Sequence, residues 1–193
     1  MKNDINKAAR ILANSFGTGH KLLVCGNGGS ASDADHIVAE LVKAFKKRRP
    51  VDSEEAQEMF QQCGRFGGIM SMALEKGLPA ISLNSQTSLI TAIANDSGYE
   101  MVFAQQVYAY GEKGDVLIGI TTSGESNNVL MALKLAKYMG MKTILLTGNE
   151  PPLYTDADLI IKTDASRTDL SQEEMTVIYH RICEKVEDFF FDA

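Results

Sequence analysis

Hydrophobic and polar residues follow a helical period at the start of the chain. Residues 5–16 place apolar side chains at intervals of three or four, which is the spacing of one helix face. Gly17 and Gly19 then interrupt the pattern, and the short apolar run at residues 21–25 predicts a strand. The chain therefore opens with a helix followed by a strand.

Four further short runs, rich in Ile, Leu and Val, predict the remaining strands. They are residues 79–83, 115–121, 142–146 and 158–162. Helical spacing fills most of the segments between them, at residues 31–49, 89–94, 101–110, 127–139 and 171–190. Strand and helix in alternation predict an α/β fold, a doubly wound parallel five-stranded sheet flanked by helices as a three-layer sandwich.

One helical segment lies outside this alternation. Pro50 ends the helix predicted at 31–49, and Asp52 with Glu55 has the spacing of a capping box that begins another helix near Ser53. A chain of 193 residues is long enough for one ordinary domain. We therefore expect a single domain over 1–193, with a helical insertion at about 46–78.

Charge and composition narrow the choice of partners. The net charge of −6 and the pI near 5.1 argue against nucleic acid, and we interpret the basic run at 46–49 as a solvated helix end. No apolar run is long enough to cross a bilayer, so we expect no membrane partner. The first residues lack the apolar core of a signal peptide, and the three scattered cysteines suit reduced thiols. These features favour a cytoplasmic protein.

A glycine-rich turn follows the first strand. The run GNGGSA, starting at Gly26, formally matches the dinucleotide fingerprint GxGxxA. A nicotinamide site also needs an acidic residue after the next strand, but that strand ends at Asn84. The turn could still bring the backbone close to an anion at the helix start, although a plain strand-to-helix turn also explains the glycines.

A second turn is rich in hydroxyl groups. It follows the strand predicted at 115–121 and carries Thr121, Thr122, Ser123 and Ser126. Hydroxyls and free helix-terminal amides together can bind phosphate oxygens. N-capping by Ser126 is the alternative, and spacing alone does not separate the two.

Three side chains are candidates for acid/base or metal chemistry. His36 and Glu40 lie four residues apart on a predicted helix, with about 5–6 Å between their Cβ atoms, and a surface hydrogen bond is the simpler alternative. His180 follows Gln172 by eight residues, roughly 12 Å along a helix and about 80° around it. One metal reaches both only if the side chains converge, the helix bends or a neighbouring subunit contributes.

In combination, these motifs resemble the sugar isomerase (SIS) family. The patterns CGNGGSxxDxxHxxxE, TTSGESxNV and QxxxxxxxH are similar to those of the phosphoheptose isomerases, which convert sedoheptulose 7-phosphate to D-glycero-D-manno-heptose 7-phosphate. The resemblance covers most of the chain from Lys21 onward, except about 46–78, and implies the SIS fold with an insertion atypical of the family.

The resemblance also implies which residues form the site. The zinc ligands would be His36, Glu40, Gln172 and His180, with Glu40 and His180 also the catalytic acid/base pair. The substrate-binding residues would be Asn27, Gly28, Gly29, Asn95, Asp96, Thr121, Thr122, Ser123, Ser126, Asp169 and Gln172. A ketose–aldose isomerase moves a proton between C1 and C2 and so needs a base and an acid, but the sequence leaves the assignment of the two roles open.

The resemblance further implies a homotetramer with sites near subunit contacts, and two positions depart from the family. Ala44 stands where an arginine is common, with Lys43 and Arg48 nearby. Glu125 replaces the usual asparagine of the hydroxyl-rich turn, and we expect its carboxylate to face away from a phosphate. Two alternatives therefore stay open: an isomerase of another ketose phosphate, and a non-catalytic SIS protein that binds a sugar phosphate as a scaffold or regulator.

Overall fold

Helices and strands alternate along the chain in the computed structural model, which describes residues 1–150, 152–154 and 156–191. The helices are α1 (Lys2–Gly17), α2 (Gly29–Val42), α3 (Ser53–Ala73), α4 (Thr87–Ser97), a 3₁₀ turn (Tyr99–Met101), α5 (Val102–Tyr110), α6 (Asn127–Tyr138) and α7 (Thr168–Phe190). The strands are β1 (Leu22–Gly26), β2 (Ala80–Ser82), β3 (Val116–Thr121), β4 (Lys142–Thr147) and β5 (Leu159–Lys162). Within the described ranges, no helix has both the length and the apolar character that a bilayer crossing demands.

The five strands form one parallel sheet in the order β2-β1-β3-β4-β5. All five lie where the apolar runs predicted them, and the predicted doubly wound α/β sandwich is confirmed. The chain winds outward in opposite directions from β1 and β3, which are neighbours. Their carboxyl ends therefore form the topological switch point, the usual ligand site of such a sheet.

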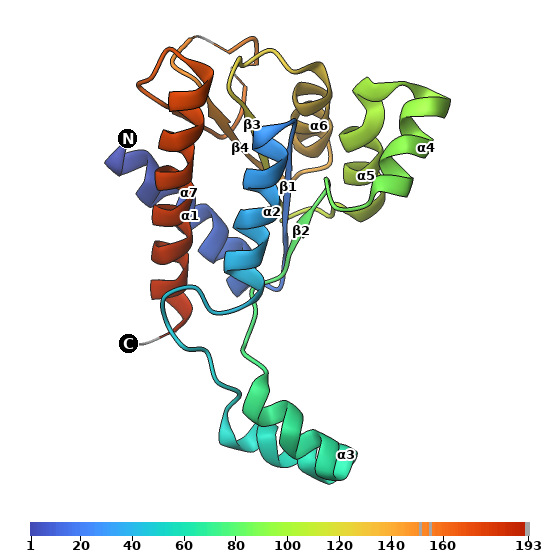
Figure 1. Cartoon of the computed structure of the whole chain (residues 1–193), viewed down its shortest axis with the longest axis vertical. Coiled ribbons are helices and arrows are strands. Elements are labelled where there is room, and N and C mark those ends of the chain that lie inside the picture. Colours follow the sequence, from blue (N-terminus) through green and yellow to red (C-terminus); the bar gives the residue numbers. More distant parts are fainter. Residues whose placement is uncertain (151, 155, 192–193) are drawn as a thin grey trace.

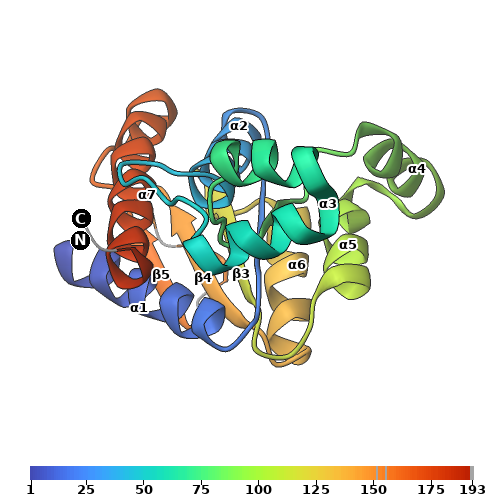
Figure 2. The same cartoon turned by 90° about the horizontal axis from the view of Figure 1, so that it is seen from below.

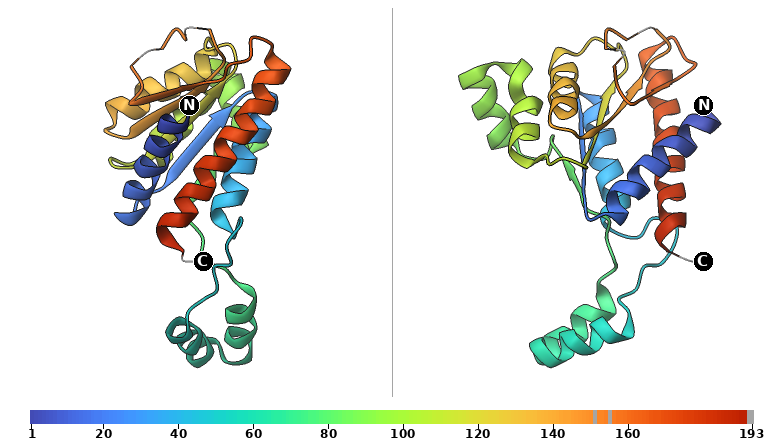
Figure 3. Two further views of the ribbon diagram at one scale, coloured as in Figure 1. Left: turned by 90° about the vertical axis from the view of Figure 1, so that its left-hand side faces the viewer. Right: turned by 180° about the vertical axis from the view of Figure 1, so that it is seen from behind.

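Both faces of the sheet are covered by helices. Leu22 and Val24 of β1 pack into a core with α1, α2 and α7, whereas Leu23 and Cys25 pack into a second core with α5 and α6. This division follows from the two-residue period of a strand. Figures 1 and 3 show α2 and α7 side by side on one face of the sheet, with α1 crossing beside α7.

The end of α2 differs from the prediction. The helix ends at Val42, so the predicted helix is wrong over residues 43–49. In a longer helix the Phe45 N–H would donate to the Leu41 carbonyl, but here it donates to Glu187 of α7, and Arg49 donates to Leu41 instead. Arg49 is 1% exposed, so the interpretation of the basic run as a solvated helix end is wrong at this residue.

The end of α4 also differs. The sequence pattern predicted a helix over 89–94 that stops before Asn95, but the helix continues through Asn95, Asp96 and Ser97. It ends at Gly98, whose φ of 96° is a conformation that glycine adopts without strain. The break therefore falls at the glycine and not at the polar residues before it.

Helix α3 projects away from the body of the molecule as an arm, which we define as residues 51–74 (Figures 1 and 3). Figure 2 views the molecule from the side of this arm. Non-helical backbone at Gly64 bends α3 into two segments, and Gly67 is its buried residue. Asp52 accepts a hydrogen bond from the Glu55 N–H at 2.9 Å, which confirms the predicted cap. Pro50 and Glu75 form an antiparallel bridge, so the arm leaves and rejoins the body at one place.

Candidate active site

A histidine and a glutamate from α2 meet a histidine from α7. The Nε2 atom of His36 lies 2.9 Å from Oε1 of Glu40 and 3.4 Å from Nε2 of His180. One ligand atom from each of the three residues lies within 4.8 Å of the other two. A single chain therefore brings the two helices' polar side chains together, without a neighbouring subunit.

The surroundings of the two imidazoles fix their orientation. The Tyr179 hydroxyl lies 3.0 Å from Nδ1 of His36, on the side of the ring away from Glu40. The Phe45 ring stacks on the His180 ring, with 5.4 Å between the centroids. Burial lowers the pKa of His180, and the charges of His36 and Lys46 add to this while Glu40 opposes it. His180 is thus favoured in its neutral form, which can bind a metal or accept a proton.

The donor set fits a divalent metal such as Zn²⁺. Two imidazole nitrogens and a carboxylate oxygen are typical zinc ligands. Tyr179 bonds the far nitrogen of His36, as partners of metal-binding histidines commonly do. The His/Glu/His group is therefore a candidate metal centre.

Gln172, the fourth predicted ligand, lies beside the glycine-rich turn. A Cβ atom added at Gly29 would stand 2.2 Å from the Gln172 Nε2 atom, so the carboxamide fills the space that the glycine leaves. The second turn of α7 therefore touches the start of α2 at this point. A role for Gln172 as a metal ligand stays a prediction.

The turns after β1 and β3 are joined side by side at the switch point. Asn27 donates to Asn128 at 2.8 Å, and Asn128 donates back to Asn27 at 2.9 Å. The Tyr99 hydroxyl donates to the same Asn27 oxygen at 3.0 Å. Between Asn27 and α2, Gly28 has a φ of 59°, which favours glycine at this point of the turn.

The predicted hydroxyl groups of the second turn lie together. Thr121 Oγ1 is 2.9 Å from Ser126 Oγ and 3.3 Å from Ser123 Oγ. Ser126 occupies the N-cap position of α6, but its side chain makes no capping bond. These hydroxyls are therefore grouped with one another at the helix start.

A hollow opens beside this turn, between the end of β3 and the start of α7. It is lined by Thr122, Ser123, Glu125, Gly148, Asn149, Glu150, Ala165, Ser166, Arg167, Thr168 and Ser171. Glu125 is exposed and belongs to this lining, as does the cationic Arg167. The hollow thus combines hydroxyl groups, a helix N-terminus and charges of both signs.

Three predicted residues are not joined to the His/Glu/His group. Asn95 donates to its neighbour Asp96, and both are exposed. Asp169 pairs with Arg167 at the start of α7. Among the described residues, none of the three forms a hydrogen bond with His36, Glu40 or His180.

Several site residues escape prediction from the sequence. These residues contact partners that are far away in the chain, and no motif spacing indicates such pairs. They are Asn128, Tyr99, Tyr179 and Phe45. The one local signal was the position of Asn128 directly after the hydroxyl-rich turn. The structure adds that its amide is buried and therefore needs a partner.

Comparisons with known proteins agree with this geometry. The SIS domain family model matches residues 1–61 and 54–148. A phosphoheptose isomerase of Thermodesulfovibrio yellowstonii is 40% identical over 189 residues, covering 97% of this chain and 81% of the relative. That of Crocosphaera subtropica is 41% identical over 182 residues, covering 94% and 80%.

Solved structures of phosphoheptose isomerases are also similar to this chain. The phosphoheptose isomerase of Neisseria gonorrhoeae has a TM-score of 0.76 and 33% identity, with 96% of this chain and 86% of that chain covered. The one from Francisella tularensis has a TM-score of 0.79 and 30% identity, with the same coverage of 96% and 86%.

A parallel sheet of this order, with a hydroxyl-rich turn at its switch point, defines the class of SIS-domain sugar phosphate isomerases. The identity to the curated relatives extends over nearly the whole chain. The chain belongs to the phosphoheptose isomerase family.

Proposed function

We propose that this protein interconverts D-sedoheptulose 7-phosphate and D-glycero-D-manno-heptose 7-phosphate through an enediol. The observation that carries the proposal is the convergence of His36, Glu40 and His180 in a member of this family. The substrate class, a heptose phosphate, is proposed from the relatives, which are phosphoheptose isomerases.

The chemistry follows from the two candidate acid/base groups. Glu40 takes the proton from C1 of the ketose and returns it to C2, while His180 moves a proton between O2 and O1. The lowered pKa of His180 supports this role, because a neutral imidazole can accept a proton from one oxygen and deliver it to the other.

The substrate is held by the two turns. Thr121, Thr122, Ser123 and Ser126 bind the phosphate through their hydroxyls and the free amides of α6. The sugar hydroxyls meet the remaining predicted residues, namely Asn27, Gly28, Gly29, Asn95, Asp96, Asp169 and Gln172. We likewise propose that residues 1–193 form a single SIS domain, with a helical insertion at about 46–78 that contains the arm.

We assign the metal as Zn²⁺, held by His36, Glu40, His180 and Gln172. A bound Zn²⁺ supplies Lewis-acid stabilisation of negative charge on the substrate oxygens, worth several kcal/mol. Titration with zinc in competition with a chromophoric chelator tests the ligands: His36→Ala is expected to lose high-affinity binding. Equal zinc affinity in wild type and variant would show that His36 is not a metal ligand.

The reaction is tested with a panel of ketose phosphates of five to seven carbons. Proton exchange at C1 and C2 is followed by NMR in deuterated water, with the full-length protein supplied with zinc. The seven-carbon substrate is expected to exchange fastest. Exchange with a shorter ketose alone would support the alternative substrate, and no exchange at all would support the non-catalytic alternative.

Matched variants separate the acid/base groups from ordinary carboxylates and imidazoles. Glu40→Gln and His180→Gln are expected to lower exchange by about 10²–10⁴-fold. Glu112→Gln and His20→Gln change the same residue types at the opposite, amino end of the sheet and are expected to exchange like wild type. Full exchange in both Glu40→Gln and His180→Gln would show that these residues are not the acid and base of the reaction.

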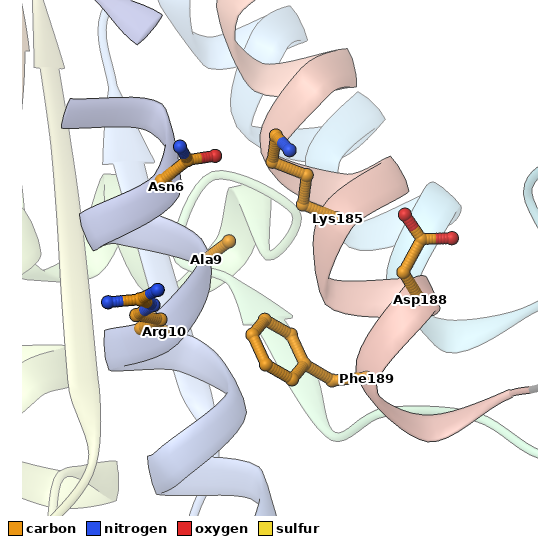
Figure 4. Close-up of a pocket in the computed structure, with 6 residues that line it drawn as sticks. All are labelled: Asn6, Ala9, Arg10, Lys185, Asp188 and Phe189. Atoms are coloured by element: carbon orange, nitrogen blue, oxygen red, sulfur yellow. The ribbon is translucent and has the colours of Figure 1, made fainter. Parts of the chain in front are cut away.

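We further propose a homotetramer, built on the faces of α1 and α7. A hollow between these helices is lined by side chains from both, which Figure 4 labels. Its Phe189 is 57% exposed, which suits burial by another subunit. Native mass spectrometry should give four times the 21.1 kDa chain, and a 21.1 kDa species at working concentration would contradict this.

The cytoplasm is the proposed location. All three cysteines are free, as is typical of proteins in a reducing compartment. Fractionation of the native cells, with activity measured in each fraction, tests this location.

A further inference from the structure

A buried ion pair lies two helical turns below His180. The Arg49 guanidinium contacts the Glu187 carboxylate through Nε and Nη2, each at 3.0 Å. Arg49 is 1% exposed and Glu187 is fully buried. Glu187 lies seven residues after His180 on α7, so both side chains project from the same side of the helix.

Arg49 reaches from this pair to the end of α2. Its Nη1 donates to the Leu41 carbonyl at 2.7 Å, and its Nη2 donates to the Glu40 carbonyl at 3.2 Å. Carbonyls in the last turn of a helix have no partner within the helix. The guanidinium therefore ties the turn of α2 that carries Glu40 to α7, and it does so with donors that a single ammonium group cannot supply together.

Glu187 orders the segment that follows α2. It accepts the Phe45 N–H at 3.1 Å and the Lys46 N–H at 3.0 Å. The Phe45 backbone is thereby fixed next to α7, where its ring stacks on His180 at 5.4 Å and 30°. One carboxylate thus joins Arg49, the backbone at Phe45 and, through the Phe45 ring, the imidazole of His180.

We propose that Arg49 and Glu187 are positioning residues for the acid/base pair: their ion pair sets the position of the Glu40 turn and of the Phe45 ring against His180. The proposal rests on the proposed function for its effect on the rate. Its effect on the His180 ring is independent of that function.

The test replaces the ion pair by apolar residues of similar size, in the variant Arg49→Met/Glu187→Leu. Such replacements often preserve folding, because neither partner is left as an unpaired buried charge. We expect kcat to fall by about 10²-fold, as for a small displacement of reacting groups, with KM changed by less than about threefold. KM changes little because the hydroxyls proposed to bind the phosphate lie in the turn after β3, away from the ion pair.

The second readout is the ¹H–¹³C NMR signal of the His180 ring in the full chain. The protein has only three histidines, so His180→Gln assigns the signal. The double variant is expected to lose the ring-current shift that Phe45 imposes, and Phe45→Leu should reproduce that loss. Lys47→Met removes the neighbouring, partly exposed ion pair with Asp188 and is expected to change neither readout.

Loss of rate together with movement of the His180 signal supports the proposal. A folded double variant in which either readout stays at the wild-type value overturns it. If the double variant does not fold, Arg49→Lys keeps the charge and loses the paired donors, and the same two readouts decide. If the wild type shows no isomerisation, the proposed function fails, whereas the His180 signal still decides whether the ion pair positions the ring.

Discussion

At the scale of single residues, the glycine-rich turn combines two requirements. Gly28 adopts a positive φ, which other residues rarely do without strain, whereas Gly29 lies in an ordinary helical start. What Gly29 provides is space, because the Gln172 carboxamide occupies the position of a side chain there. The two neighbouring glycines are therefore needed for different reasons.

Replacement of Gly29 by alanine tests the second reason. The added Cβ would lie 2.2 Å from the Gln172 Nε2 atom, so the carboxamide must move. We expect Gly29→Ala to fold, with kcat and zinc affinity each lowered about tenfold, because a misplaced group near the reacting atoms is sufficient to slow a reaction. Steady-state kinetics and zinc titration measure both values.

Gly17→Ala is the matched control. A Cβ added at Gly17 meets no atom within 4 Å, and Gly17 ends α1 on the far side of the molecule from the turn. If both Gly17→Ala and Gly29→Ala kept wild-type kinetics, the observed position of the Gln172 carboxamide would not matter for the reaction.

The three cysteines differ in their surroundings. Cys25 and Cys183 are buried, whereas Cys63 in the arm is exposed. Burial raises the pKa of the Cys25 thiol, and burial, with a smaller effect of the Glu40 charge, raises the pKa of Cys183 to about 12. At neutral pH both buried thiols are therefore protonated and unreactive.

A thiol titration checks this difference. With an aromatic disulfide reagent at about pH 8, close to the ordinary thiol pKa of about 8.5, the native protein is expected to expose one reactive thiol per chain. Denaturant should raise that number to all three of the chain's cysteines. Cys63→Ser is expected to remove the native reaction, and a native reaction that survives this substitution would contradict the burial of the other two.

Local residue patterns were sufficient for part of the site. His36 and Glu40 are four residues apart on one helix, and the hydroxyls of the second turn fall within six residues, so their proximity was predictable. Asn27 and Asn128 are 101 residues apart, and Arg49 and Glu187 are 138 residues apart. Such pairs depend on the packing of separate elements, which a single sequence does not specify.

At the scale of elements, strands were more predictable than helix ends. A strand buried on both faces is a continuous apolar run, and β1, β3 and β4 are of this kind. A helix end is decided by a competition for its last carbonyls, and α2 loses its next turn because Arg49 and Glu187 offer better partners. The competing groups lie on a different element, so the pattern around residues 43–49 did not reveal them.

The contact between α7 and the segment after α2 has a pH dependence. Burial acts to raise the pKa of Glu187, but the N–H groups of Phe45, Lys46 and Lys47, together with Arg49, outweigh it and hold the pKa below its ordinary value of 4.5. A carboxyl with a lower pKa in the folded state stabilises the fold above the unfolded pKa. That stabilisation is lost as the pH falls through the folded pKa.

Urea unfolding across a pH series measures this linkage. The free energy of unfolding of the wild type should fall more steeply below pH 4.5 than that of Arg49→Met/Glu187→Leu, which lacks the titrating carboxyl. At neutral pH, Arg49→Met alone should lose about 3–5 kcal/mol, because it leaves a buried charge without its partner. Parallel pH curves for wild type and double variant would show that Glu187 has no lowered pKa.

At the scale of the whole molecule, the arm and the body are distinct in their packing. The body contains two cores, one on each face of the sheet, and no residue of α3 belongs to either core within the described ranges. The exposed apolar side chains of the arm include Phe60, Phe66 and Met72. We therefore expect the stability of the sheet not to depend on the arm.

Deletion of the arm tests this independence. Pro50 and Glu75 form a bridge, so residues 51–74 can be replaced by a two-residue Asn-Gly turn. We expect the free energy of unfolding to change by less than about 1 kcal/mol, or about 2–4 °C in Tm. A deletion of equal length at 87–110 removes Val107 and Phe103 from a core and should prevent folding. Loss of the fold in both deletions would contradict the distinction.

The hydroxyl groups of the second turn and the His36/Glu40/His180 group belong to different layers of the molecule, one at the strand ends and the other on α2 and α7, which cover one face of the sheet. Under the proposed function, this separation selects substrates by their length. The number of carbons in a sugar phosphate sets the distance between its bound phosphate and its carbonyl. A shorter ketose phosphate would then still dock but leave its carbonyl short of the proton-transferring groups, so the selection would register in kcat and not in KM.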